Sequence, residues 1–145
     1  MKTNNYKLFL DDIRMPDAAF IYEERIKLLD KTHTHSCEWE IVRNYNEFCE
    51  FIDKFGIPEI VSFDHDLTME FMQHYYDVTS KTGVVEYDKL ESKCGLDCIK
   101  YLCDYCERFQ LKFPRYFIHS ANRWGTINMH AYIKEFFKKC GHLQC

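Results

Sequence analysis

The sequence predicts a single three-layer α/β domain, in which helices cover both faces of a parallel sheet of about four to five strands. Its 145 residues are enough for one domain with its own core, and 46% of them are hydrophobic. Short apolar runs, typical of buried strands, alternate with longer segments of helical periodicity. This alternation is typical of parallel strands joined by helical crossovers. We expect one domain over residues 1–145.

The first half of the chain contains three predicted strands and two predicted helices. The first apolar run ends abruptly at two aspartates and is typical of a buried strand. Pro16 then breaks the chain, and Asp17 is a candidate N-cap for the loosely helical segment that follows. Gly56 and Pro58 end the second helix. In order, these elements are a strand at 7–10, a helix at 17–30, a strand at 39–42, a helix at 46–55 and a strand at 59–63.

The second half contributes a fourth strand and two more helices. An apolar stripe of Leu96, Ile99, Cys103 and Cys106 predicts the first of these helices. In order, the elements are a helix at about 96–109, a strand at 116–118 and a helix from about 125 with Ile127, Tyr132, Ile133, Phe136 and Phe137 on its apolar face.

Residues 68–93 fit neither pattern, because they are polar and rich in tyrosine. A long segment without regular structure in a compact domain is usually a functional lid or a disordered insertion. We expect it to be the most mobile internal segment and to lie over the carboxyl edge of the sheet. Tyr75, Tyr76 and Lys81 would then close on a base or a phosphate.

Charge and hydropathy argue against two classes of partner. The formal net charge is −4, so the chain has no general attraction for duplex nucleic acid. No apolar run approaches the roughly 20 residues that span a bilayer, and the first residues lack the apolar core of a signal peptide. We therefore expect a cytoplasmic protein that binds neither duplex DNA nor a membrane. In that reducing compartment, its eight cysteines are expected to be free thiols or metal ligands.

Two of these cysteines have the spacing of a zinc half-site. Cys103 and Cys106 are two residues apart, and Cys140, His142 and Cys145 are available to complete a site. The alternative is that Cys103 and Cys106 belong to the core, because they share the apolar stripe of their helix. We favour the core interpretation and expect Cys140 and Cys145 to be exposed thiols.

Polar residues directly follow three of the predicted strands. In open parallel sheets, ligands bind just beyond the carboxyl ends of the strands. The fold prediction therefore brings together clusters that lie far apart in the sequence. They are Asp11-Asp12, Asp64-His65-Asp66 and His119-Ser120-Ala121-Asn122.

The aspartates of these clusters predict a metal site. Carboxylates that converge on one edge repel each other unless protons or a cation neutralise them. Oxygen ligands suit a hard ion, and we expect Mg²⁺ or Mn²⁺ as the cofactor. The alternative is that aspartates at strand ends cap helices and turns. The predicted ligands are Asp11, Asp12, Asp64 and Asp66.

His65 and His119 are candidate catalytic residues, because imidazole exchanges protons near neutral pH. Each is alternatively a hydrogen-bonded edge residue. Alternation along an extended strand would direct His65 away from Asp64 and Asp66, so His119 is the stronger candidate. As a strand-end side chain, His119 is expected to contribute little to core packing.

Neutral donors and one arginine are the candidate phosphate ligands. Backbone N–H groups at the start of the last helix favour an anion. Asn122 is alternatively the N-cap of that helix, and Arg14 alternatively pairs with Asp11 or Asp12. The predicted phosphate-binding residues are Ser120, Asn122, Asn128 and Arg14.

One motif from each strand end resembles the cyclic-phosphate-processing receiver-like domain family. The motifs are Leu10-Asp11-Asp12-Ile13-Arg14-Met15-Pro16 (LDDxRxP), Ser62-Phe63-Asp64-His65-Asp66-Leu67 (SxDHDL), and His119-Ser120-Ala121-Asn122 with Gly125, Asn128 and Met129 (HSxNxxGxxNM). The resemblance runs over nearly the whole chain apart from residues 68–93. It implies a receiver-like fold whose acidic residues bind a metal and whose site acts on cyclic phosphates.

The sequence is also similar to ordinary two-component receivers. The acidic doublet, Asp64 at the phosphoacceptor position and Ser120 after the fourth strand match their layout. A fifth strand ending in lysine is not predicted. The added His65 and His119 point toward hydrolysis rather than passive acceptance of phosphate.

We therefore expect a metal-dependent phosphoesterase that acts on a cyclic phosphate of a nucleotide, a nucleotide-derived molecule or an RNA end. The alternative from another class is a non-catalytic receiver-like module that accepts phosphate on Asp64 or binds a nucleotide without cleaving it. A third hypothesis is an effector whose surface binds another protein.

Overall fold

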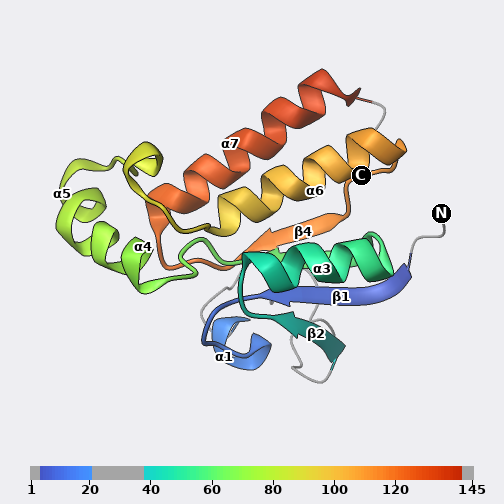
Figure 1. The fold of residues 1–145 in the computed structure, drawn as a ribbon, viewed down its shortest axis with the longest axis horizontal. Helices are drawn as coiled ribbons and strands as arrows, with labels where there is room; N and C mark the ends of the chain where they lie inside the picture. The colour runs from blue at the N-terminus through green and yellow to red at the C-terminus, as the bar shows by residue number, and fades with distance from the viewer. Residues whose placement is uncertain (1–3, 21–37, 142–145) are drawn as a thin grey trace.

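The computed structural model describes residues 4–20 and 38–141, and its centre is a β-sheet (Figure 1). In the described part of the chain the sheet has four strands, in the order β2-β1-β3-β4. All the pairings are parallel, which confirms the predicted class. The strands are β1 (Asn4–Leu10), β2 (Trp39–Val42), β3 (Pro58–Phe63) and β4 (Arg115–Ile118).

Helices cover both faces of this sheet. Residues of α3, α6 and α7 pack on one face, and α1 packs on the other. Both faces are therefore covered, as the sequence predicts. The long helices are α3 (Tyr45–Phe55), α6 (Gly95–Phe109) and α7 (Arg123–Lys139), and the short ones are α1 (Pro16–Phe20), α4 (Met69–His74), η3 (Tyr75–Thr79), α5 (Ser80–Thr82) and η4 (Tyr87–Lys89).

Side-chain alternation along β1 decides which residues meet each layer. Leu8 and Leu10 join the larger core under α3, α6 and α7, whereas Phe9 joins the smaller cluster on the other face. The register pairs Leu10 with Phe63 and Phe9 with Ser62. Because paired residues of parallel strands share a face, Ser62 lies on the same face as Phe9.

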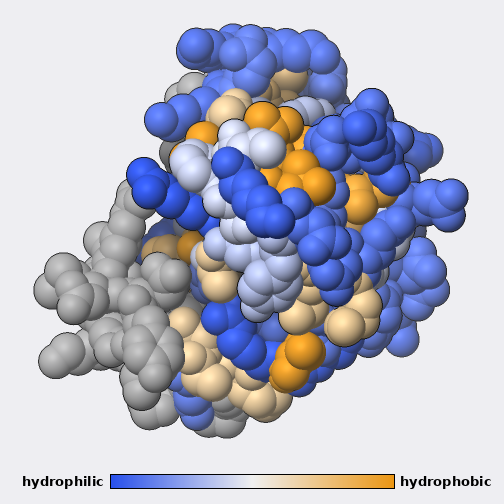
Figure 2. Space-filling view, turned by 90° about the vertical axis from the view of Figure 1, so that its left-hand side faces the viewer, coloured by the Kyte–Doolittle hydropathy of each residue, from blue (hydrophilic) through white to orange (hydrophobic). Residues whose placement is uncertain are grey.

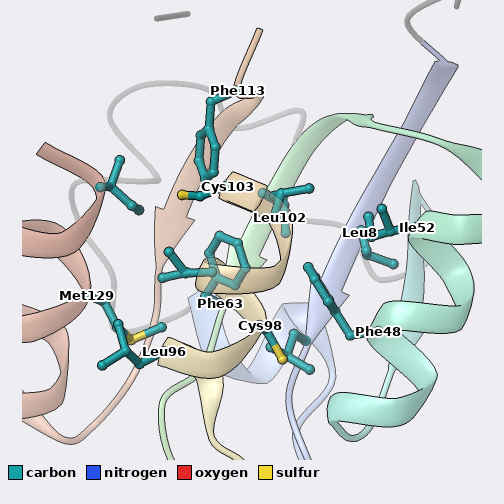
Figure 3. Packing of buried hydrophobic residues seen from close by; sticks show 14 of the residues in the cluster. Leu8, Phe48, Ile52, Phe63, Leu96, Cys98, Leu102, Cys103, Phe113 and Met129 are labelled. Atoms are coloured by element: carbon teal, nitrogen blue, oxygen red, sulfur yellow. The ribbon is translucent and has the colours of Figure 1, made fainter. Parts of the chain in front are cut away.

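The larger core fills the space between the sheet and its three long helices (Figure 3). Phe48 of α3, Leu102 of α6 and Met129 of α7 are completely buried there. Phe63 and Phe113 add two of the largest buried side chains. The aromatic residues that are frequent in the sequence thus supply much of this core.

Two helix starts differ from the prediction in detail. Asp17 lies in the first turn of α1 and is not its N-cap, and the predicted residues 21–30 of that helix lie outside the described residues. Helix α7 begins at Arg123, before the predicted start near residue 125, because the side chain of Asn122 caps it by accepting from Gly125 N–H. The cap interpretation of Asn122 is confirmed.

Residues 68–93 are not a segment without regular structure, which corrects that expectation. They form α4, the π-helix η3, α5 and the 3₁₀-helix η4. Thr68 caps α4, and Phe71 is buried in the larger core. The apolar residues of this segment are too few and too irregularly spaced for a helical pattern to stand out. Helix α4 is instead stabilised by its N-cap Thr68 and by one buried side chain, Phe71.

The described cysteines are free thiols, and most of them are core residues. Cys103 and Cys106 lie on the buried face of α6, where burial raises the pKa of each thiol. Cys140 is also buried, which corrects its expected exposure. Cys145 and His142 lie outside the described residues. The burial of Cys103 and Cys106 agrees with the core interpretation.

None of the helices in the described residues combines the length and the apolarity that crossing a membrane requires.

The order of the strands places a crevice at the carboxyl ends of β1 and β3. From β1 the chain connects to β2 on one side and later to β3 on the other. This reversal of strand order is where open α/β sheets bind ligands. The segments that follow β1, β3 and β4 meet there. Residues 68–93, called the insertion from here on, lie at the same side of the molecule (Figure 1).

Candidate functional site

Asp11 and Asp64 lie side by side at the carboxyl ends of β1 and β3. Asp64 N–H donates to Leu10 C=O at 3.0 Å, and Asp11 N–H donates to Val42 C=O at 3.2 Å. The sheet ladders thus extend one residue past the strands and fix both backbones. Asp11 is fully buried, and Asp64 is 6% exposed.

The Asp11 carboxylate is held by four donors. The backbone N–H groups of Ile13 and Arg14 donate to Oδ1 at 2.9 and 2.8 Å, which closes the loop after β1 into a turn. Arg14 Nε and His119 Nε2 approach Oδ2 at 2.9 and 3.1 Å. Burial alone would raise the pKa of Asp11. The hydrogen bonds from His119, Ile13 and Arg14 outweigh burial and hold that pKa below its usual range, so Asp11 is ionised.

Arg14 pairs with Asp11, in agreement with the alternative interpretation of this residue. Its Nη2 also donates to the carbonyl of His119 at 3.0 Å and lies 3.8 Å from Asp64 Oδ1. Arg43 supports the same loop, because its Nη1 donates to the carbonyls of Asp11 and Arg14 at 3.0 and 2.7 Å. The arginines therefore shape the loop after β1 and supply positive charge beside its acids.

The pKa values of Asp64 and Asp12 are raised, whereas that of Asp11 is lowered. Burial, with the negative charge of Asp11 next to it, raises the pKa of Asp64 to about 8. Burial and the same neighbour also raise the pKa of Asp12. Arg14 lowers both values but does not cancel the effect. The edge thus carries more carboxyl groups than its arginine neutralises, which is the arrangement that favours a cation.

His119 is buried on the face of the sheet that carries the smaller hydrophobic cluster, which includes Phe9. Its ring stacks on Phe9, with centroids 4.5 Å apart, and only 1% of the residue is exposed. Because an ionised carboxylate only accepts, Nε2–H donates to Asp11, and Nδ1 accepts from the Ser62 hydroxyl at 2.7 Å. Burial lowers the pKa of His119, which agrees with a neutral ring. The expectation that His119 contributes little to packing is wrong.

His65 packs against Phe71 of the larger core and lies beside Asp66, which corrects the expectation that it would point away from that residue. Its Nδ1 is 2.6 Å from Asp66 Oδ1, and its Nε2 is 2.8 Å from the Tyr87 hydroxyl. Asn128 Nδ2 donates to that hydroxyl at 3.1 Å. Nδ1–H therefore donates to Asp66, and the Tyr87 hydroxyl donates to Nε2. The ring itself is fully buried.

Two glycines allow the helices to approach this histidine and Asp64. A Cβ added at Gly125 would lie 2.4 Å from the ring of His65, and one at Gly95 would lie 1.8 Å from the Asp64 carbonyl oxygen. No side chain fits at either position. The glycine of the third motif is thus required because α7 begins directly against His65.

Asn122 joins the segment after β4 to the segment after β3. Its Nδ2 donates to Asp66 Oδ1 at 3.1 Å, while its Oδ1 accepts from Gly125 N–H. Its own N–H donates to the Ser120 hydroxyl at 3.0 Å. Both atoms of the Asn122 amide are therefore engaged within the protein, whereas the Ser120 hydroxyl keeps its proton available to donate.

A cavity of about 370 Å³ opens over the acidic edge. The strand-end loops form one part of its lining, and the insertion forms the other. Its lining residues are Asp11, Asp12, Ile13, Arg14, Asp64, Asp66, Met72, Tyr75, Tyr76, Ser120, Ala121 and Asn122.

The cavity brings together seven of the sequence-predicted site residues. His65, His119 and Asn128 are not among its lining residues, because the histidines lie behind the acids and Asn128 supports Tyr87. The insertion contributes Tyr75 and Tyr76 but not Lys81. The seven that line the cavity are Asp11, Asp12, Arg14, Asp64, Asp66, Ser120 and Asn122.

Sequence reasoning missed three residues that organise this site. Arg43 directly follows β2, so the strand-end argument that found the acids would also have found it. Ser62 belongs to the SxDHDL motif, but its bond to His119 gave no signal, because that contact forms only in the folded chain. Tyr87 gave none either, since it lies in the insertion and reaches His65 only through the fold.

The donor set fits a hard divalent cation. Ligand atoms of Asp11, Asp64 and His119 lie within 4.8 Å of one another, which makes these residues a potential metal-binding group. The carboxylate oxygens of Asp11 and Asp64 suit Mg²⁺ or Mn²⁺. Both ring nitrogens of His119 are engaged, and each Asp11 oxygen already accepts two hydrogen bonds, so a cation at Asp11 would compete with those donors. Asp12 and Asp66 line the same cavity outside this group.

The buried network around His65 predicts a loss of stability in Tyr87→Phe. The substitution removes the hydroxyl that bonds both His65 and Asn128 while keeping the ring. Because it leaves the buried His65 Nε2 with only the weak Cys94 thiol contact at 4.0 Å, we expect the free energy of unfolding to fall by about 1–3 kcal/mol. Chemical denaturation measures this, with Tyr105→Phe on α6 as the control. Equal stability of the two variants would contradict the network.

Comparison with known proteins agrees with the geometry of this site. No curated protein and no solved structure matches the chain. The family model described as "Cyclic-phosphate processing Receiver domain" matches residues 6–135, which include all three strand-end clusters and the insertion. The parallel sheet, the acids at its switch point and this match over most of the length agree with one another. The chain belongs to the cyclic-phosphate processing receiver domain family.

Proposed function

We propose that the protein is a metal-dependent phosphoesterase that opens a cyclic phosphate of a nucleotide, a nucleotide-derived molecule or an RNA end. One observation carries the proposal: in a chain of this family, Asp11 and Asp64 lie side by side where the cavity meets the sheet edge. A phosphate anion entering that cavity meets carboxyl groups, so a cation must accompany it.

Asp11, Asp12 and Asp64 would hold this cation, which we propose to be Mg²⁺ or Mn²⁺. When bound, it would supply positive charge to the phosphoryl oxygens and lower the pKa of water. Arg14 adds fixed positive charge, since it is anchored on Asp11 and lies near Asp64. The Ser120 hydroxyl would donate to a phosphate oxygen.

Proton transfer in the cavity would pass through Asp66. Neither histidine lines the cavity, but Asp66 does, and it lies 2.6 Å from His65 Nδ1. Asp66 would accept a proton from the attacking water, while His65 and Tyr87 hold its carboxylate in place. The water oxygen bonds to phosphorus, and one ester P–O bond breaks. The proton ends on the released hydroxyl group, so the ring opens to a phosphomonoester.

His119 would act through Asp11 rather than on the substrate. Its ring fixes one oxygen of Asp11, and Ser62 fixes the ring. Such outer partners orient ligands and commonly change metal affinity about 10–100-fold when mutated. We therefore propose a positioning role for His119, and a supporting role for Asn128 through Tyr87.

A substrate screen tests the proposal. Nucleoside 2′,3′- and 3′,5′-cyclic phosphates, RNA with a terminal 2′,3′-cyclic phosphate and ADP-ribose cyclic phosphate would each be incubated with Mg²⁺, with Mn²⁺ and with a chelator. We expect a phosphomonoester product only with metal. Turnover that persists in the chelator would overturn metal dependence, and no turnover of any ring would overturn the activity.

The layout of Asp64 and Ser120 favours one alternative, a receiver-like module that accepts phosphate. Asp64 lines the cavity at the end of β3, and Ser120 lines it after β4. Incubation with acetyl phosphate and Mg²⁺ followed by mass spectrometry separates the two functions. A stable aspartyl phosphate without turnover in the screen would favour the module over the hydrolase.

The raised pKa of Asp64 predicts how the metal-free protein responds to pH. Its pKa rises from 3.8 to about 8 on folding, so between these values the folded state holds a proton that the unfolded state has lost. The contribution of Asp64 to the free energy of unfolding therefore decreases as pH rises from about 4 to about 8. The lowered pKa of buried His119 has the opposite effect below about pH 6.5. With chelator, we therefore expect Tm to fall between about pH 6.5 and about pH 8, and millimolar Mg²⁺ to restore it at the upper end.

Asp64→Asn should remove most of this slope and most of the Mg²⁺ response, because its side chain stays neutral. Asp104→Asn, at an exposed acid on α6, should keep both. Scanning calorimetry in both buffers measures the effect. A wild-type Tm that Mg²⁺ and Mn²⁺ leave unchanged would contradict the metal site.

A further inference from the structure

One side of the cavity is apolar and aromatic, unlike the acidic edge beside it. Met72, Tyr75 and Tyr76 of the insertion line it together with Ile13 and Ala121. Ile13 and Tyr76 are 69% and 64% exposed, although they come from segments far apart in the sequence. Figure 2 views the molecule from the side toward which the strands point, and hydrophobic residues lie among hydrophilic ones on this face. Exposed apolar groups beside a polar site are typical of ligand binding.

Two contacts hold the start of α4, the helix that leads directly into the tyrosines. Glu70 accepts hydrogen bonds from Ser92 N–H and Ser92 Oγ at 2.8 and 2.6 Å, which ties α4 to the far end of the insertion. Phe71 packs into the core against His65, and its ring lies 5.8 Å from the imidazole. Phe71 thus connects α4, the helix that leads into the tyrosines, to the histidine that holds Asp66.

A π-helical turn presents both tyrosines to the cavity. In η3, Ser80 N–H donates to Tyr75 C=O, which is the wider spacing of a π-helix. The rings of Tyr75 and Tyr76 meet edge to face, with centroids 5.6 Å apart, and both residues line the cavity. Single π-helical turns within α-helices often occur at functional sites.

We infer that this side of the cavity binds the base of a single nucleotide whose cyclic phosphate lies at the acidic edge. The inference rests on the proposed function and specifies its substrate class. Every base offers a flat face that stacks on an aromatic side chain. A volume of about 370 Å³ lies near the lower end for ligand sites and suits one nucleotide rather than several.

Charge favours a mononucleotide over an RNA end. Along a polynucleotide, each further phosphate needs a cation from the protein to contribute to binding. In the described part of the chain, Arg14 is the cation that lines the cavity, and it is paired with Asp11. A free nucleotide with one phosphate ring meets the metal and Arg14 and needs no further basic residue.

The test compares two substrates that differ only in the base. Adenosine 2′,3′-cyclic phosphate is set against 1-O-methylribose 2′,3′-cyclic phosphate, and kcat/KM gives a base-discrimination ratio. We expect the wild type to favour the nucleotide and Tyr76→Ala to lower the ratio about tenfold, chiefly through the KM for the nucleotide. Tyr76→Phe should keep most of the ratio because its ring remains. Tyr105→Ala on α6 is the control variant.

Binding of the products, adenosine 3′-phosphate and 1-O-methylribose 3-phosphate, is measured by calorimetry with Mn²⁺ on the same variants. A ratio that Tyr76→Ala and Tyr75→Ala both leave unchanged would overturn the inference. Higher kcat/KM for an oligoribonucleotide ending in the same ring would overturn the mononucleotide class. If the wild type opens neither of these two rings, the substrate screen above still decides the proposed function, and the ratio of product affinities decides the inference alone.

Discussion

Asp64→Asn is expected to lower the metal-dependent rate of ring opening by about a hundredfold or more, because it removes a charged metal ligand worth several kcal/mol in the transition state. The substitution should leave the fold intact. Burial raises the pKa of Asp64 to about 8, so without metal the wild-type side chain is already neutral near neutral pH. An amide oxygen can accept from His65 N–H as the carboxyl oxygen does at 2.8 Å.

The measurement is kcat/KM over a titration of Mg²⁺ and Mn²⁺, with the Tm of each variant in chelator. Asp104→Asn on α6 is the matched control and should keep the wild-type rate. The metal assignment would fail if Asp64→Asn turned over at a near-normal rate. A large loss of Tm in chelator would instead show that the substitution acts on folding.

His119→Ala is expected to lower the free energy of unfolding by about 2–4 kcal/mol, a large effect for a residue at a strand end. The ring stacks on Phe9 and is buried, so its removal leaves a cavity. The substitution also takes a partner from Asp11 and from the buried hydroxyl of Ser62. Turnover should fall as well, through weaker metal binding by a misplaced Asp11.

Chemical denaturation and a metal titration separate these effects. Ser62→Ala removes only the bond behind the ring and should cost about 1 kcal/mol. His130→Ala, at a partly buried histidine of α7 that contacts Tyr116, is the control for metal affinity and should leave it unchanged. If His119→Ala kept wild-type stability and metal affinity while kcat alone collapsed, His119 would be a direct proton-transfer residue, as the sequence suggested.

The three clusters of the site follow from local sequence. A short apolar run that stops at charged residues marks both a buried strand and its carboxyl end, and neither inference needs a distant contact. Parallel topology then brings these ends to one edge whatever the side chains are. For this reason the sequence predicts that Asp11, Asp64 and Ser120 lie together, and all three line the cavity.

The orientation of each side chain at that edge depended on tertiary contacts. His65 and His119 both follow strands, yet one packs against Phe71 and Tyr87 and the other against Phe9, so neither reaches the cavity. Arg14 pairs with Asp11 because the turn after β1 brings its side chain back onto that carboxylate. The sequence offers Asp11 and Asp12 equally as partners of Arg14, and only the folded turn decides between them.

The insertion shows the same division most clearly. Its composition marked residues 68–93 as exceptional but gave no sign of α4 or of the π-helical turn. These elements are stabilised by Thr68, by Glu70 and by one buried ring, Phe71, rather than by a periodic apolar face. Periodicity records burial along a whole helix, whereas single anchors act through contacts between residues distant in sequence. Such contacts exist only in the folded chain. The local sequence pattern therefore predicts where the site lies, whereas tertiary packing decides which side chains line it and which support it from behind.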